Sequence, residues 1–194
     1  MIATTSELPE VEETDLLATA TLQEHLTIED FMANPCDRME WIDGKLVETN
    51  GMTLKHSRIQ SKLGRCWANY KDSTGQGGEV YTEPPCRTNQ QVRRPDVAYL
   101  TPELVVQFGD VSTLPQSFSL VAEIVAPTDI AEDMFLKAQE YLASSCKEVW
   151  LVFPDSQLVF VVNYNQILGF RAGETVRSQQ ILTDFSIAVD ELLA

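Results

Sequence analysis

The chain has 194 residues, of which 44% are hydrophobic, and this is enough for one domain with a sizeable core. Its formal net charge of −15 argues against nonspecific electrostatic attraction to a polyanion. No segment approaches about 18 consecutive apolar residues, and the N-terminus lacks the basic and then apolar pattern of a signal peptide. We therefore predict a cytoplasmic protein with no membrane association.

The negative charge is concentrated near the N-terminus. Residues 1–30 contain eight acidic residues and no Lys or Arg, which leaves 21 acidic against 14 basic residues in the remainder. Residues 1–25 are Thr- and Ala-rich with little apolar periodicity, as is typical of a solvated segment. We predict an acidic, disordered tail over residues 1–25 and a single domain over residues 26–194. The net charge of the remainder is −7, about half that of the whole chain, so the charge argument against nucleic-acid binding is weaker but remains.

The domain is predicted to begin with a short helix and a hairpin. In "LTIEDFMANP", Thr27 is a candidate N-cap, Asp30 follows three residues later, and Pro35 ends the segment. In "MEWIDGKLVE", Asp43 and Gly44 lie between two short alternating runs, which is the pattern of a two-residue hairpin turn.

A longer amphipathic helix is predicted from residue 56 to residue 70. Ile59, Leu63, Trp67 and Tyr70 lie on one helical face. Three basic residues lie on another face: Arg58, Lys62 and Arg65. A basic stripe of this kind is usually a solvated surface, but it is also a candidate border for a phosphate path.

The rest of the chain alternates between apolar runs and one further helix. Strands are predicted at 79–83, 86–92, 94–100, 118–126, 147–154 and 157–164, with a loop up to residue 116 and a helix over 129–145. An apolar run, a helix and a second apolar run indicate a βαβ crossover. Together with the preceding hairpins, this pattern predicts a mixed α/β fold with a mixed sheet.

Two carboxylates occupy unusual places in these runs. Asp96 opens one strand-like segment, and Glu123 lies within the apolar run "LVAEIVAP", where an unpaired charge would be costly. Two carboxylates from adjacent strands and a backbone carbonyl beside Glu123, that of Ile124, would form an all-oxygen site for Mg²⁺ or Mn²⁺. Such an ion would lower the pKa of a bound water and stabilise charge on a phosphate.

The ordered motifs resemble a known family. "MEWIDGKL", His56 with Ile59 and Leu63, "RRPDVAYL", "LVAEIVAPTD", "DMFLKAQEYL" and "KEVWLVFPD" are together similar to the Uma-type family of restriction-endonuclease-like proteins, in the PD-(D/E)XK nuclease superfamily. The resemblance covers about residues 26–193. It implies a mixed central sheet flanked by helices, with Asp96 and Glu123 as metal ligands and Glu40 as a further acidic group.

The chain departs from the family pattern at several positions. Val125 stands two residues after Glu123, where the superfamily has Lys, and Lys137 on the following helix matches the family's relocated lysine. Ala126 and Phe153 replace the Ser and Asp that are frequent in the family.

The resemblance implies a magnesium-dependent endonuclease that hydrolyses phosphodiester bonds of DNA. In this hypothesis Asp96, Glu123 and Lys137 are catalytic, and Glu40 and His56 are accessory. Arg58, Lys62 and Arg65 are candidate phosphate contacts, and a homodimer is a candidate assembly. The alternative from another class is a catalytically inactive nucleic-acid-binding or protein-interaction module on the same fold, and a third is a purely structural homodimer.

Each site residue also has a structural interpretation. Glu123 is a candidate for a core salt bridge to Arg93 or Arg94. Lys137 is a candidate for a surface pair with Asp133, which lies four positions earlier on the helix. His56 is interpretable as a polar residue at a helix start, and Glu40 as a hairpin residue, while Tyr141 is expected in the core, on the same helical face as Lys137.

Overall fold

The computed structural model describes residues 26–49 and 53–194, so the predicted tail over residues 1–25 lies outside the described residues. Its centre is a six-stranded sheet in the order β10-β9-β8-β7-β6-β3. The strands are β3 (Glu79–Thr82), β6 (Val97–Leu100), β7 (Leu120–Ile124), β8 (Glu148–Phe153), β9 (Leu158–Val162) and β10 (Ile167–Arg171). Because β7 and β8 are parallel and the other pairs are antiparallel, the predicted mixed sheet is confirmed.

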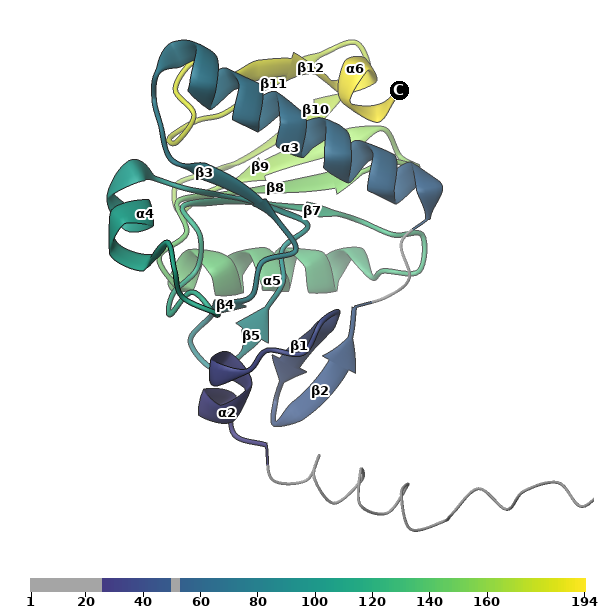
Figure 1. The fold of residues 1–194 in the computed structure, drawn as a ribbon. Helices are drawn as coiled ribbons and strands as arrows, with labels where there is room; N and C mark the ends of the chain where they lie inside the picture. Colours follow the sequence, from purple (N-terminus) through teal and green to yellow (C-terminus); the bar gives the residue numbers. More distant parts are fainter. Residues whose placement is uncertain (1–25, 50–52) are drawn as a thin grey trace, which may run out of the picture.

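One face of this sheet is covered by α3 (Leu54–Thr74) (Figure 1). Ile59, Leu63 and Trp67 on α3 are fully buried against apolar side chains of the sheet. The C-terminal elements β11 (Thr175–Arg177), β12 (Ser186–Ala188) and α6 (Val189–Leu193) contribute to the same core. The sequence predicted α3 from its apolar face, and α3 extends beyond the predicted residues 56–70 at both ends.

The other face is covered by α5 (Ala131–Ala143), which connects β7 to β8. Ala138, Tyr141 and Leu142 on α5 pack against Val121 and Val149 in a second buried cluster. The predicted βαβ crossover is therefore confirmed. Along β7, Val121 faces α5 while Ala122 and Ile124 belong to the α3 side, so strand alternation turns Glu123 toward α5.

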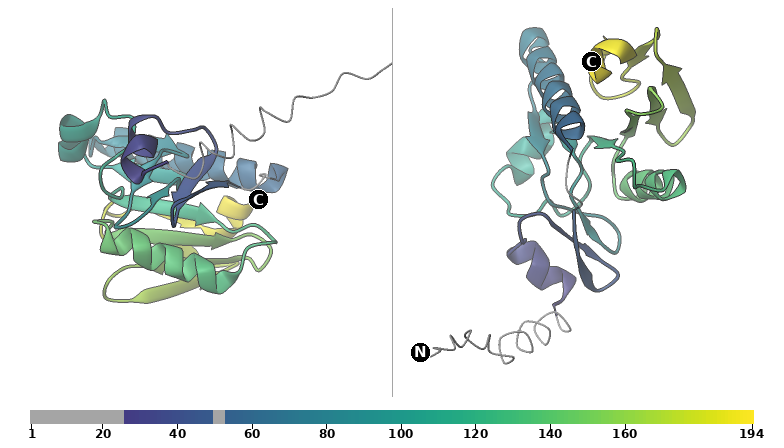
Figure 2. Two further views of the ribbon diagram at one scale, coloured as in Figure 1. Left: turned by 90° about the horizontal axis from the view of Figure 1, so that it is seen from below. Right: turned by 90° about the vertical axis from the view of Figure 1, so that its right-hand side faces the viewer.

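A second, four-stranded sheet lies at the end of the molecule away from α3 (Figures 1 and 2). Its order is β2-β1-β5-β4, with β1 (Met39–Ile42), β2 (Lys45–Glu48), β4 (Cys86–Arg87), β5 (Val92–Arg93) and, beside it, the short helix α2 (Ile28–Ala33). The hairpin turn is confirmed, since Asp43 and Gly44 have φ values of 48° and 80°. The capping box between Thr27 and Asp30 is also present.

The structure differs from the sequence-based prediction in three places. The hairpin β1–β2 belongs to this separate sheet and not to the central one. The predicted strand over 86–92 is two short strands, β4 and β5, joined by a turn in which Thr88 donates its backbone N–H to Gln91. The predicted loop up to residue 116 contains α4 (Pro102–Phe108), a short helix whose Leu104, Val105 and Phe108 are only partly buried against the second cluster.

Within the described parts of the chain, no helix combines the length and the apolar character needed to cross a membrane.

Candidate active site

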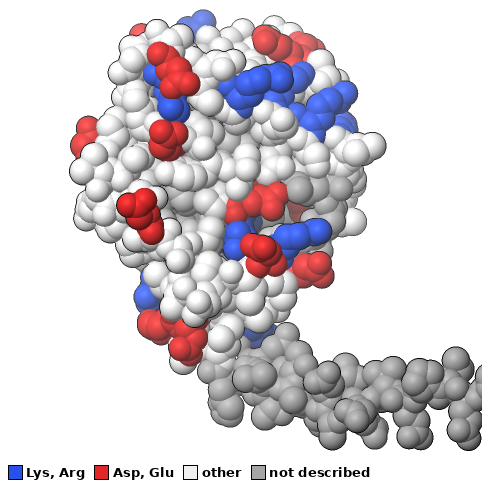
Figure 3. All heavy atoms as spheres, viewed as in Figure 1, with Lys and Arg blue, Asp and Glu red and all other residues white. Residues whose placement is uncertain are grey.

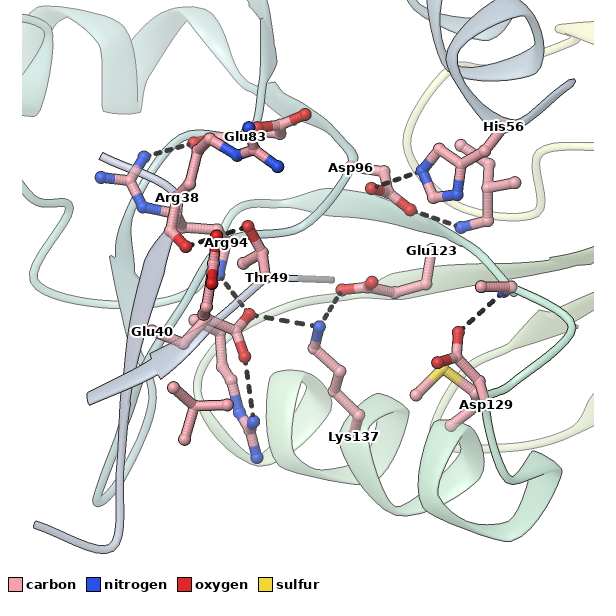
Figure 4. A pocket seen from close by; sticks show the side chains of 16 residues that line it. Arg38, Glu40, Thr49, His56, Glu83, Arg94, Asp96, Glu123, Asp129 and Lys137 are labelled. Atoms are coloured by element: carbon pink, nitrogen blue, oxygen red, sulfur yellow. Dashed lines mark hydrogen bonds and ion pairs between the residues drawn. The ribbon is translucent and has the colours of Figure 1, made fainter. Parts of the chain in front are cut away.

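The two sheets meet α5 and the start of α3 at a pocket (Figure 4). Side chains from both sheets and from both helices line it. All five catalytic and accessory residues predicted from the sequence are among them: Glu40, His56, Asp96, Glu123 and Lys137.

Asp96 and Glu123 are brought together by strand register. In the antiparallel pair β6–β7, Val97 lies opposite Ala122, so Asp96, directly before β6, comes to the end of β7 that carries Glu123. Asp96 is fixed at both carboxylate oxygens. Its Oδ2 accepts a 2.6 Å hydrogen bond from the backbone N–H of Ile124, and its Oδ1 lies 3.0 Å from Nε2 of His56.

Glu123 is buried and has two partners at a single oxygen. Tyr141 donates its hydroxyl to Oε1 at 2.7 Å, and Nζ of Lys137 lies 3.0 Å from the same atom. Burial raises the pKa of Glu123 to about 7, and the negative charges of Asp96 and Glu40 act in the same direction, while Lys137 opposes them. Oε2 accepts no hydrogen bond from the described residues and remains available to a ligand.

Lys137 points into the pocket from α5. Its ammonium lies between two carboxylates, 3.0 Å from Glu123 Oε1 and 3.2 Å from Glu40 Oε1, and not beside Asp133 as the surface interpretation had it. Burial acts to lower the pKa of Lys137, but the charges of Glu123 and Glu40 raise it above the usual value overall. The side chain is therefore a fixed cation at neutral pH.

Glu40 reaches the pocket from β1 and is held by three donors. Lys137 and the backbone N–H of Arg94 contact Oε1, the latter at 2.8 Å, and Arg93 contacts Oε2 at 3.2 Å. Burial would raise the pKa of this carboxyl, but Lys137 and Arg93 lower it overall, so Glu40 is ionised. Arg93 also pairs with Glu140 at 2.7 Å.

His56 lies in the first turn of α3, where Thr53 caps the helix through the backbone N–H of His56. Its ring is half-buried against Asp96. Burial acts to lower the pKa of His56, but the hydrogen bond and the negative charge of Asp96 raise it overall. His56 thus orients the carboxylate of Asp96 and places a group that can carry a proton at the edge of the pocket.

The basic stripe of α3 does not reach the pocket. Arg58 donates to the carbonyl of Leu193 at 3.3 Å, and Lys62 donates to the carbonyls of Glu191 and Ala194 at 2.7 and 2.9 Å. Arg65 lines a neighbouring groove between α3 and β3. Figure 3 shows basic side chains over α3 and, apart from them, a mixed acidic and basic group toward the β1–β2 hairpin. The phosphate contacts predicted for the stripe thus lie outside the pocket.

The comparison with protein families decides the membership of this chain. The model of a family described as "Uma2: Putative restriction endonuclease" matches residues 22–190. The chain belongs to the Uma2 family. No curated protein matches the sequence.

The Uma2 assignment agrees with a solved structure. A crystal structure of a protein from Anabaena variabilis, described as "a putative nuclease belonging to DUF820", superposes with a TM-score of 0.76. The two sequences are 19% identical, and the match covers 87% of this chain and 98% of the other. At this identity the likeness establishes the fold, which is the nuclease-like mixed α/β architecture predicted from the sequence.

Several pocket residues of this Uma2 chain were not predicted as site residues. Arg94 donates to the carbonyls of Cys36, Met39 and Glu83, at 2.8, 3.1 and 2.8 Å, and so ties the four-stranded sheet to β3 and its following turn. Asp129 accepts a 2.7 Å hydrogen bond from the backbone N–H of Ala126 and shapes the loop after β7. The pair of arginines directly before Pro95 was the available signal for Arg94.

The oxygen atoms in one part of the pocket are suitable ligands for a hard divalent cation. Asp96 and Glu123 offer carboxylate oxygens, each with more than one acceptor position, and the Ile124 carbonyl adjoins them in sequence. Glu40 is satisfied by its three donors. Among the residues that the structure describes, no group of three or more His, Cys, Asp and Glu side chains is arranged as a ready-made metal site. Asp96 and Glu123 are therefore the candidate carboxylate ligands, and Glu40 is not.

Proposed function

We propose that the protein is a metal-dependent nuclease that hydrolyses phosphodiester bonds of DNA. The observation that carries this proposal is the position of Lys137 Nζ, 3.0 Å from Glu123 and in the same pocket as Asp96. Two carboxylates and an ammonium in one pocket match the needs of phosphoryl chemistry, which are a place for a cation and a positive group for the phosphate. Membership of a family described as restriction endonucleases supports the same reaction class.

In the proposed reaction, the carboxylates of Asp96 and Glu123 would hold Mg²⁺ or Mn²⁺, with the Ile124 carbonyl as a further ligand. When bound, the ion lowers the pKa of a water molecule and neutralises charge on the phosphate. Tyr141 and the backbone N–H of Ile124 keep the two carboxylates in place.

Lys137 supplies the second positive group. Its ammonium is kept charged by Glu40 and Glu123, and it meets a phosphate oxygen or the attacking water as negative charge develops during in-line displacement. His56 orients Asp96 and takes up a proton at the pocket edge.

A non-catalytic binding module on the same fold is the alternative. Its support is Val125, an apolar and nearly buried residue at the position where the superfamily has lysine, together with the acidic balance of the chain. The two functions differ in what Mg²⁺ does. Both allow binding of nucleic acid, but only the nuclease converts bound DNA into shorter products.

The test combines plasmid cleavage with metal-dependent thermal stability. The wild-type protein should nick or cut plasmid DNA with Mg²⁺ or Mn²⁺ and not with EDTA, and it should melt at a higher temperature when millimolar Mg²⁺ is added. Asp96→Asn should abolish both effects, whereas Lys137→Ala should lose cleavage and keep the stabilisation.

The matched controls are Asp133→Asn and Lys147→Ala, because both residues are exposed and outside the pocket. Each control should behave as the wild type. Metal-independent cleavage, or a Lys137→Ala variant that cuts at the wild-type rate, would contradict the proposed mechanism. DNA binding with no products under any metal would favour the binding module.

A further inference from the structure

We propose that the pocket takes one divalent cation, because the ammonium of Lys137, held by Glu40, occupies the place that a second cation would need. This inference rests on the proposed metal-dependent function and adds the number of ions and a role for Glu40. Glu40 is a positioning residue for Lys137 in this scheme and not a metal ligand.

The argument begins with the two oxygens of Glu123. In two-metal phosphoryl-transfer sites the ions lie about 3.5–4 Å apart and share ligands. In the two-oxygen mode of carboxylate bridging, Glu123 would give one oxygen to each ion. Its Oε1 is already occupied, since Lys137 Nζ lies 3.0 Å away and the Tyr141 hydroxyl lies 2.7 Å away. This leaves Oε2 as the oxygen of Glu123 that would bind a cation.

Glu40 is the carboxylate that would complete a second site, and it holds the lysine instead. Its Oε1 lies 3.2 Å from Lys137 Nζ and accepts the backbone N–H of Arg94 at 2.8 Å. The ammonium therefore lies between Glu40 and Glu123, as a bridging cation would (Figure 4).

Arg93 makes this place still less suitable for a divalent ion. Its guanidinium contacts Glu40 Oε2 at 3.2 Å and is itself fixed by Glu140 at 2.7 Å. A second divalent ion beside Glu40 would lie next to this fixed positive charge and would have to displace the ammonium as well. A single positive charge from lysine satisfies both carboxylates at less electrostatic cost.

The side of the pocket that carries Asp96 is where the proposed ion would bind. Asp96 and Glu123 are its candidate carboxylate ligands, and the pocket is also lined by Glu48, Glu83 and Asp129. In this scheme Asp96 and Glu123 serve the metal, whereas Glu40 and Glu123 hold the lysine.

The experiment is a calorimetric titration of the full chain with MnCl₂, which reports the number of ions bound per chain without any activity measurement. The wild type should bind one ion. Lys137→Ala should bind two, because its removal leaves Oε1 of Glu40 and Oε1 of Glu123 without the ammonium that lies between them. Lys137→Arg, which keeps a positive charge, should still bind one.

The double variant Lys137→Ala with Glu40→Gln should return to one ion, and Lys147→Ala serves as the control at an exposed lysine. Two ions in the wild type, or one ion in a folded Lys137→Ala variant, would overturn the inference and leave the metal-dependent nuclease standing. No ion in the wild type would overturn the metal-dependent function and this inference with it. The wild-type titration decides between these outcomes even if a variant does not fold.

Discussion

The hydroxyl group of Tyr141 donates a hydrogen bond of 2.7 Å to Oε1 of Glu123 in the protein interior. Tyr141 lies four residues after Lys137 on α5, so both side chains project from one face of the helix toward the same oxygen. Burial and the nearby charge of Glu123 raise the pKa of Tyr141 well above its usual value, which keeps the phenol protonated and able to donate. A residue expected in the core thus also sets the orientation of a site carboxylate.

Tyr141→Phe should lower both the stability of the metal-free protein and its affinity for Mn²⁺. A hydrogen bond to a charged group contributes about 1.5–3 kcal/mol, and its loss also frees Glu123 to rotate. Denaturant unfolding and calorimetric titration measure the two effects. Tyr164→Phe removes a hydroxyl from an exposed tyrosine outside the pocket and should leave Mn²⁺ affinity unchanged. Equal Mn²⁺ affinity in Tyr141→Phe and the wild type would exclude the orienting role.

The stability of the metal-free protein should fall as the pH rises from about 5 to about 8. The pKa of Glu123 is about 7 in the folded protein against its usual 4.5, so the folded protein binds the extra proton in this window and loses stability as that proton leaves. His56 acts with the same sign, because its pKa is also raised and the stability it contributes at low pH is lost as the pH rises.

Glu123→Gln should flatten this pH dependence and raise the stability of the metal-free protein at about pH 8. The full shift corresponds to roughly 3 kcal/mol at most, since one pKa unit is worth about 1.4 kcal/mol. Thermal melts in EDTA over this pH range test the prediction, with exposed Glu132→Gln as the control. A wild-type protein that gains stability toward pH 8 would show the sign to be wrong.

Val125→Lys should restore part of the cleavage lost in Lys137→Ala. Position 125 lies two residues after Glu123, so an extended chain turns its side chain toward the same face of the sheet, and a lysine there returns the positive charge from another backbone position. Plasmid cleavage by the single and double variants measures the rescue. Restoration by Ile130→Lys, at an exposed position just before α5, would instead indicate a general effect of added positive charge.

Deleting residues 1–24 should leave the melting temperature nearly unchanged and strengthen binding to DNA. The segment carries acidic residues and little apolar periodicity, so we expect it to contribute no core. The deletion stops before Leu26, whose carbonyl accepts a 3.0 Å hydrogen bond from the indole of Trp41. A fall of many degrees would place the domain boundary closer to the N-terminus.

The parts of the site that follow from local periodicity were predictable. Strand alternation places Glu123 on one face of β7, and the apolar pattern of residues 129–145 predicts the helix that carries Lys137. Asp96 directly precedes the apolar run that forms β6. Strand alternation, helix periodicity and one βαβ crossover are enough to predict these positions.

The remaining contacts depend on the packing of distant segments. Nothing in the sequence near Glu40 indicates that a separate sheet brings it to Lys137, or that Arg93 pairs with Glu140 and Glu40 and not with Glu123. The same holds for the basic stripe, because the partners of Arg58 and Lys62 lie about 130 residues later in α6. Such pairings are decided by tertiary structure.

One link between the two sheets is only three residues long. β5 ends at Arg93, which forms a salt bridge with Glu40, and β6 begins at Val97, so the segment from Arg94 to Asp96 joins the two sheets at the pocket. Pro95, in the middle of this segment, restricts the backbone, and the guanidinium of Arg94 donates hydrogen bonds to three backbone carbonyls. A displacement of Asp96 on ligand binding would act through this short segment on Arg93 and its salt bridge to Glu40, so we expect the Asp96 side and the Lys137 side of the pocket to adjust together.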